Sequence, residues 1–195
     1  MNNFNELNTV EHYLIHLLSG VNLNNVTNNT IKESPVTYQD RTQWRYNQPD
    51  LLKRDITDVM IESEVKDALC RLNPAIGINP DKADEVIHKL RSIILSVNNV
   101  GLVRANEEFS KWLRGEITLP FGKNHQHINI RLIDFDHIEN NKFTITNQLV
   151  FRAREVKIPD IVLYVNGFPL VIGEIKTPVR PSISWIDGAH DINII

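Results

Sequence analysis

Apolar residues recur at helical spacing in two parts of the chain and gather into short runs in a third. The first helical pattern lies between residues 9 and 20, where Gly20 is a stop signal. A long stretch from 21 to 57, rich in asparagine, shows little periodicity and predicts irregular structure. From 58 to 115, three apolar stripes predict a helical region that is interrupted at Asn73-Pro74.

Beyond residue 115 the pattern becomes that of strands. Short apolar runs separated by turn residues occupy 126–177. The expected strands cover residues 128–133, 143–151, 161–165 and 170–175. Helices first and strands afterwards indicate an α+β fold rather than a regular alternation of strand and helix.

The composition is that of an ordinary globular protein, with 42% hydrophobic and 23% charged residues in a chain of 195. The single cysteine, Cys70, cannot form an internal disulfide and suits a reducing cytoplasm. No run reaches the roughly 20 apolar residues of a membrane span. A net charge of −3 argues against a protein that coats nucleic acid, but it does not exclude an enzyme that receives DNA from a partner.

Three ionisable side chains stand at the ends of two apolar strands joined by Asn166-Gly167. Asp160 lies at the start of the first strand, and Glu174 and Lys176 lie at the end of the second. Charges beside such apolar strands need a reason, because burying an unpaired carboxylate is costly. Side chains alternate along a strand, so Glu174 and Lys176 are expected to point the same way.

Whether Asp160 shares that face depends on the turn. A two-residue turn in a regular ladder would put Asp160 opposite Gly173 and would point it away from Glu174. A three-residue loop of Val165-Asn166-Gly167, or an equivalent bulge, would bring Asp160 and Glu174 to one face. We therefore predict such a loop or bulge, and a tight two-residue hairpin would count against the site.

In the predicted register, two carboxylates and one ammonium group converge. Hard cations such as Mg²⁺ prefer oxygen ligands and bind through one or two carboxylates and a substrate phosphate. The cation would polarise that phosphate and lower the pKa of an attacking water, and Lys176 would orient the water or stabilise developing charge. The alternative for the same residues is a solvated strand end that carries a Glu–Lys pair.

The segment from Pro159 to Pro178 resembles the nuclease motif of type I restriction-modification R subunits. In that family, Pro-Asp, an apolar strand, Asn-Gly-x-Pro-Leu, a second apolar strand and Glu-x-Lys follow one another, as they do here. Further similar stretches are Thr9–His12, Ala105–Phe109, Leu132–Asp136, Glu139–Phe143 and Asn147-Gln148. The resemblance implies a restriction-endonuclease-like PD-(D/E)xK core, with a mixed β-sheet flanked by helices and a helical insertion, in one domain over residues 1–195.

The resemblance also implies roles for individual residues. Asp160 and Glu174 would be metal ligands, and Lys176 would be the catalytic lysine. Glu11 matches the acidic residue on the first helix that helps to form the metal site in this superfamily. A glutamate favoured by the helix dipole is an equally good interpretation of Glu11. The implied activity is cleavage of double-stranded DNA that depends on Mg²⁺ or Mn²⁺.

The full subunit of that family also contains an ATP-driven DNA translocase, and it works with methyltransferase and specificity subunits. This sequence has no Walker motif, so we expect ATP to bind only the full-length subunit, of which this chain is a cytoplasmic fragment with no membrane partner. The alternatives are a stand-alone repair nuclease of the same superfamily and a non-catalytic docking domain. The arginines outside the motif are interpreted as solvated surface residues: Arg41, Arg45, Arg152 and Arg154.

Overall fold

The structure is a computed structural model that describes residues 10–25, 44–153, 155–176, 186 and 189. The chain divides into two compact units. Unit 1 contains Met1–Val59 and Phe143–Ile195, and unit 2 contains Met60–Lys142. Unit 2 is thus an insertion within the sequence of unit 1, as the predicted fold requires.

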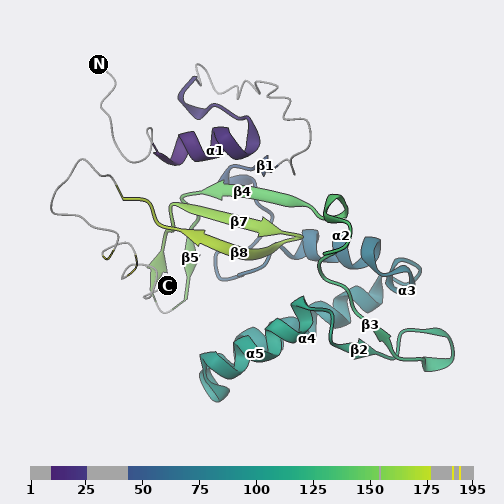
Figure 1. The fold of residues 1–195 in the computed structure, drawn as a ribbon. Helices are drawn as coiled ribbons and strands as arrows, with labels where there is room; N and C mark the ends of the chain where they lie inside the picture. Colours follow the sequence, from purple (N-terminus) through teal and green to yellow (C-terminus); the bar gives the residue numbers. More distant parts are fainter. Residues whose placement is uncertain (1–9, 26–43, 154, 177–185, 187–188, 190–195) are drawn as a thin grey trace, which may run out of the picture. The chain divides into compact units, whose positions relative to one another are not determined.

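Unit 1 is built around a four-stranded sheet in the order β1-β4-β7-β8 (Figure 1). Strand β1 (Arg45–Tyr46) runs parallel to β4 (Phe143–Asn147). Strand β7 (Ile161–Val165) is antiparallel both to β4 and to β8 (Phe168–Gly173). The sheet is therefore mixed, and with the helices beside it the α+β prediction is confirmed.

Helix α1 (His12–Ser19) lies within the predicted range and packs against this sheet. It ends at Gly20, whose φ of 76° is left-handed and whose N–H donates to the carbonyl of His16 at 2.8 Å. Glycine adopts this conformation without the steric cost that a side chain would add. On the inner face of α1, Ile15 is fully buried in a cluster with residues from β4, β7 and the end of the hairpin: Ile145, Ile161 and Ile175.

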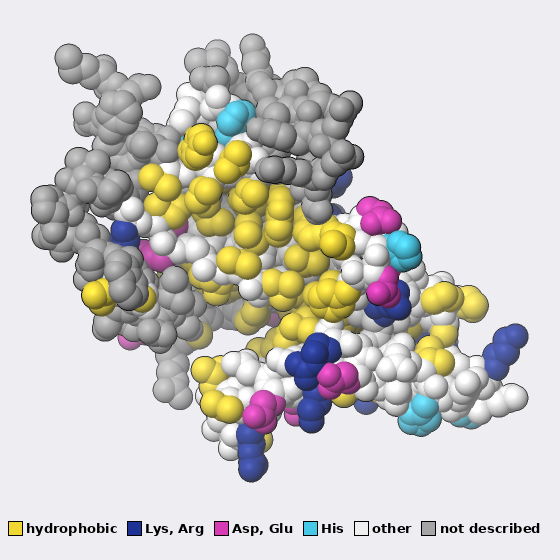
Figure 2. All heavy atoms as spheres, viewed as in Figure 1, with side chains coloured by type: hydrophobic (Ala, Val, Ile, Leu, Met, Phe, Trp, Pro, Cys, Tyr) yellow, Lys and Arg dark blue, Asp and Glu magenta, His cyan; other side chains and the backbone are white. Residues whose placement is uncertain are grey.

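Hydrophobic side chains gather over the region of α1 and the sheet in Figure 2. Strands β7 and β8 contain no charged residue. The charges of the hairpin therefore stand only beyond the strand ends, at Asp160 before β7 and at Glu174 and Lys176 after β8. This places the ionisable groups at one end of an otherwise apolar pair of strands.

The strand predicted over 143–151 is wrong in one respect, because it is broken after Asn147. Gln148 has a φ of 48°, a left-handed conformation that ends the ladder. The chain then forms a separate two-stranded ribbon of β5 (Phe151–Arg152) and β6 (Val156–Lys157). Among its described residues, unit 1 also has short 3₁₀ helices at Leu23–Asn25 and Pro49–Leu51.

Unit 2 contains α2 (Glu62–Leu72), α3 (Pro74–Gly77), α4 (Asp81–Val100) and α5 (Leu102–Leu113). These helices lie within the range 58–115 that the apolar stripes indicated. The buried members of the first two stripes include Val65, Ala68, Leu69, Val86, Leu90 and Ile93. No helix in the described part of the chain is both long enough and apolar enough to cross a lipid bilayer.

The prediction that the third apolar stripe is buried is only partly correct. Trp112 is buried on α5, but Leu102 and Val103 are 61% and 72% exposed. They occupy the first turn of α5, directly after Gly101 ends α4. The apolar pattern therefore predicted the helix but not which end of it is buried.

The strand predicted over 128–133 is wrong beyond its second residue. Strand β3 (Ile128–Asn129) pairs with β2 (Thr118–Leu119), and short 3₁₀ helices cover Lys123–His125 and Ile138–Asn140. From Arg131 onward, side chains rather than a strand partner bind the backbone. Such local hydrogen bonds compete with regular sheet pairing.

Candidate active site

The turn of the β7–β8 hairpin has two residues, Asn166 and Gly167. Their φ values of 50° and 82° are both left-handed, as in the type I′ turns that match the twist of paired strands. Val165 accordingly pairs with Phe168. The predicted three-residue loop is therefore wrong.

A bulge in β8 corrects the register instead. Tyr164 pairs with Pro169 but Leu163 pairs with Val171, so Leu170 is an extra residue without a partner across the ladder. Beyond the bulge, Ile161 is opposite Gly173. Continuing that register by one residue puts Asp160 opposite Glu174, on one face of the hairpin. The predicted equivalent of the longer loop, a bulge, is thus confirmed.

Gln148 connects two of the predicted acidic residues. Its Nε2 lies 3.0 and 3.1 Å from the two carboxylate oxygens of Glu11 and 3.1 Å from Oδ1 of Asp160. The other oxygen of Asp160 accepts the backbone N–H of Ile175 at 2.6 Å. The structure therefore brings Glu11, from the start of α1, to the aspartate at the start of β7.

The network extends to the sheet interior through Asn147. Its Nδ2 lies 3.5 Å from Oε2 of Glu11, and its Oδ1 accepts the hydroxyl of Tyr46 at 2.9 Å. Burial, with the charges of Asp50 and Glu11, raises the pKa of Tyr46 to about 12. Tyr46 therefore stays protonated and acts as a hydrogen-bond donor here.

Glu11 is a buried acid, with 2% of its surface exposed. Burial raises the pKa of its carboxyl group above 4.5, the hydrogen bond from Gln148 lowers it, and the charge of Asp160 raises it again. The net shift is upward. The amide donors around Glu11 thus do not fully offset the cost of holding its negative charge away from water.

Glu174 and Lys176 form an ion pair at the exit of β8. The Nζ of Lys176 lies 2.8 Å from Oε1 of Glu174, and both side chains are partly buried. Their i,i+2 spacing beyond a strand gives the common direction predicted from the sequence.

The donor set around Gln148 fits a hard divalent cation. Within the described residues, no three His, Cys, Asp or Glu side chains lie together as a metal-binding group. Mg²⁺ does not need three, because it keeps several waters and binds through one or two carboxylates. Glu11 and Asp160 supply two, and the buried charge of Glu11 favours a positive partner.

Three residues of this network were not predicted from the sequence as site residues: Tyr46, Asn147 and Gln148. A signal existed, because Asn147-Gln148 is a polar pair that ends an apolar strand. Of the four arginines left as surface residues, Arg45 and Arg152 are exposed. Arg41 and Arg154 lie outside the described residues.

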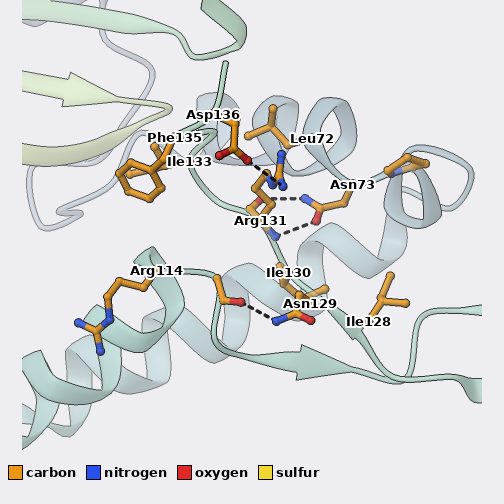
Figure 3. A pocket seen from close by; sticks show the side chains of 12 residues that line it. Leu72, Asn73, Arg114, Ile128, Asn129, Ile130, Arg131, Ile133, Phe135 and Asp136 are labelled. Atoms are coloured by element: carbon orange, nitrogen blue, oxygen red, sulfur yellow. Dashed lines mark hydrogen bonds and ion pairs between the residues drawn. The ribbon is translucent and has the colours of Figure 1, made fainter. Parts of the chain in front are cut away.

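A pocket of about 600 Å³ lies within unit 2, between α2 and the segment after β3 (Figure 3). Its polar groups already bind one another. Asn73 donates to the carbonyl of Arg131 and accepts its N–H, each at 2.8 Å. Arg131 pairs with Asp136, and Asn129 donates to Gly115. These interactions stabilise a loop, and the pocket offers no pair of acids comparable to that at Gln148.

Comparison with known proteins matches most of the chain to one family. The family described as type I restriction enzyme R protein N terminus matches residues 23–193. The type I restriction enzyme HindI endonuclease subunit of Haemophilus influenzae is 36% identical over 139 residues. The putative MjaVIIIP endonuclease subunit of Methanocaldococcus jannaschii is 28% identical over 140 residues.

These alignments cover most of this chain but little of the relatives. They include 69% of the chain and 12% of the HindI subunit, and 70% of the chain and 13% of the MjaVIIIP subunit. No solved structure matches the chain. The chain therefore corresponds to a small part of much longer proteins.

Proposed function

Because the chain belongs to the type I restriction enzyme R protein N-terminal family, we propose that it is a nuclease domain that cleaves double-stranded DNA. In this proposal, Asp160, Glu174 and Lys176 form the catalytic set, and Glu11 is a further metal ligand. The relatives that carry the name endonuclease subunit support the activity.

The observation that carries the proposal is the approach of Glu11 to Asp160 across one amide nitrogen. Both carboxylates have an oxygen within 3.1 Å of Nε2 of Gln148. Glu11 and Gln148 are 137 positions apart in the sequence. A fold that brings two acids together over this distance holds a like-charge pair, which costs stability unless a cation uses it.

Asp160 and Glu11 would hold Mg²⁺ or Mn²⁺ through carboxylate oxygens, and Glu174 would be the further acid opposite Asp160. The bound cation supplies polarisation of the scissile phosphate and a lower pKa for the attacking water. The backbone N–H of Ile175 orients Asp160 by binding its second oxygen. One carboxylate oxygen is thereby fixed, while the other stays directed at Gln148.

Lys176 would act on the substrate. Its ammonium group lies 2.8 Å from Glu174, so it holds a positive charge beside that carboxylate. A cation at this position stabilises the negative charge that develops on a phosphate during attack by water. The ion pair with Glu174 restricts the long lysine side chain, which reduces the entropy lost when DNA binds.

The rest of the reaction belongs to the full-length protein. We propose that ATP-driven translocation by its other domains delivers the DNA, and that methyltransferase and specificity subunits select the site. The small share of the relatives that this chain covers leaves room for such domains. A cytoplasmic location suits this role and the single cysteine.

Isothermal titration of Mn²⁺ tests the metal site in this chain. Binding to the wild type that is lost in Asp160→Ala would support the proposal. Asp67→Ala, at an exposed position on α2, is the matched control and should bind as the wild type does. No binding to any of the three proteins would contradict the metal site and favour a non-catalytic docking domain. Plasmid cleavage by full-length subunits carrying the same changes then tests the activity.

A further inference from the structure

Gln148 donates hydrogen bonds where the proposed function requires a cation. Its Nε2 is the nitrogen that Glu11 and Asp160 share, with three oxygens between 3.0 and 3.1 Å away. An amide NH₂ group has two hydrogens, so these two donors are divided among three acceptors. A partial positive charge thus stands between two carboxylates that would otherwise repel each other.

The backbone fixes the side chain in this position. Gln148 has a left-handed φ of 48°, which few residues other than glycine and asparagine adopt without strain. Its N–H donates to the backbone carbonyl of Asp160 at 3.1 Å. The same residue therefore binds Asp160 through both main chain and side chain, and strain of this kind is concentrated at functional sites.

We infer that Gln148 is a positioning residue that holds Glu11 and Asp160 together in the metal-free protein and releases their oxygens to a divalent cation when one binds. The inference rests on the proposed function, since it requires that a cation binds there. An amide is suited to this exchange. It neutralises less charge than Mg²⁺ does, so the cation displaces it, yet it prevents the acids from separating beforehand.

Substitution of Gln148 should affect the metal-free protein far more than the loaded one. Without divalent cations, Gln148→Ala should melt roughly 5 °C lower than the wild type, because hydrogen bonds to charged groups are lost. At saturating Mn²⁺ the two melting temperatures should coincide, since the cation then joins the acids. The rise on adding Mn²⁺ is therefore larger in the variant than in the wild type.

Gln148→Glu replaces the neutral amide with a negatively charged carboxylate of nearly the same shape. In the metal-free protein, three carboxylates would meet, and the melting temperature should fall below that of Gln148→Ala. The added ligand should lower the Kd for Mn²⁺ about tenfold relative to the wild type, because affinity rises with the number of charged ligands. Gln126→Glu, on the loop between β2 and β3, is the matched control and should change neither quantity.

A nuclear magnetic resonance titration with Mg²⁺ tests directly whether the cation displaces the Gln148 amide. The side-chain NH₂ signals of Gln148 should move as the cation binds, and those of Gln126 should stay. If Gln148→Ala is destabilised equally with and without Mn²⁺, Gln148 has only a structural role and the inference is wrong while the proposed function stands. If the wild type binds no cation, the proposed metal site fails, and the inference fails with it.

Discussion

Two buried acids, one in each unit, accept hydrogen bonds from similar residues but have opposite pKa shifts. Asp134 in unit 2 and Glu11 in unit 1 are 3% and 2% exposed, and each carboxylate accepts hydrogen bonds from an asparagine or glutamine side chain. The pKa of Asp134 is lowered, whereas that of Glu11 is raised. Burial outweighs the hydrogen bonds at Glu11, whereas the hydrogen bonds outweigh burial at Asp134.

Asp134 has an excess of donors. Its carboxylate accepts the side chain of Asn140, the backbone N–H groups of Asp136 and His137, and the guanidinium of Arg131. Hydrogen bonds to the charged form favour ionisation, and they account for most of the lowered pKa. This network is satisfied without any further ligand.

Glu11 instead shares its donors with a second acid. Gln148 donates to both Glu11 and Asp160. Burial and the charge of Asp160 raise the pKa of Glu11 by more than the hydrogen bond from Gln148 lowers it. A buried acid with too few donors lowers the stability of the free protein. Such a loss of stability is common at functional sites. The comparison therefore separates a network whose acid is satisfied by its own donors from one in which, in the proposed function, a cation would complete the site.

The largest effect is expected at Asn73 in unit 2, which binds the backbone of Arg131, a residue whose side chain pairs with Asp134. Asn73→Ala should lower the free energy of unfolding by about 3 kcal/mol. The change removes three hydrogen bonds from a buried side chain and leaves the backbone groups of Arg131 without those partners. Urea unfolding followed by circular dichroism measures the loss. Asn99→Ala, at an exposed position on α4, should change stability by less than about 0.5 kcal/mol.

The pH dependence of stability should have opposite signs at the two acids. The lowered pKa of Asp134 means that its charged form stabilises the fold above about pH 4, and that this stability is lost as the pH falls through the lower folded-state value. Asp134→Asn should therefore be less stable than the wild type at pH 7, and the gap should close in acid. A gap that stays constant between pH 7 and pH 2 would contradict this.

Glu11 should behave in the reverse way. Its folded pKa is raised above 4.5, so its contribution is favourable below that pH and is lost as the pH rises through the folded value. In a chelating buffer, Glu11→Gln should be more stable than the wild type at pH 8, with the advantage disappearing below about pH 4.5. Thermal melts from pH 2 to pH 8 measure both series. Equal pH profiles for Glu11→Gln and the wild type would show that Glu11 is not strained.

The smallest effect on stability should come from Asp160. Asp160→Ala loses the hydrogen bonds to Gln148 and Ile175, but it also removes the charge that opposes Glu11. These contributions have opposite signs, so the change in unfolding free energy should stay below about 1 kcal/mol in metal-free buffer. Urea unfolding under the same conditions as for Asn73→Ala tests this. A loss as large as that of Asn73→Ala would remove the distinction between the two networks.

The sequence predicted the hairpin and its charged ends because these features are local. Strand alternation and the Asn166-Gly167 turn limit the possible registers to a few. The position of the bulge at Leu170 was not predicted, although Pro169, which cannot donate to a ladder, directly precedes the extra residue. The requirement that Asp160 and Glu174 share a face predicted that some such irregularity exists.

The predictions that failed concern side chains whose partners are far away in the sequence. The apolar run after Ile128 resembles a strand, but Asn73 binds Arg131 from 58 positions away and replaces the ladder. Gln148 was missed as a site residue for a similar reason. It is uncharged, and its importance follows from Glu11, 137 positions earlier. Neither partnership leaves a periodic pattern in the sequence.

The separation of Glu11 from Gln148 also has a consequence for the newly made chain. Ribosomes add about 5–20 residues per second, so α1 emerges on the order of ten seconds before the residues that receive Glu11 and Ile15. The whole of unit 2 is synthesised in that interval and can fold first. The acids of the candidate site therefore meet late in biogenesis, and the candidate site forms only after the inserted unit has been synthesised.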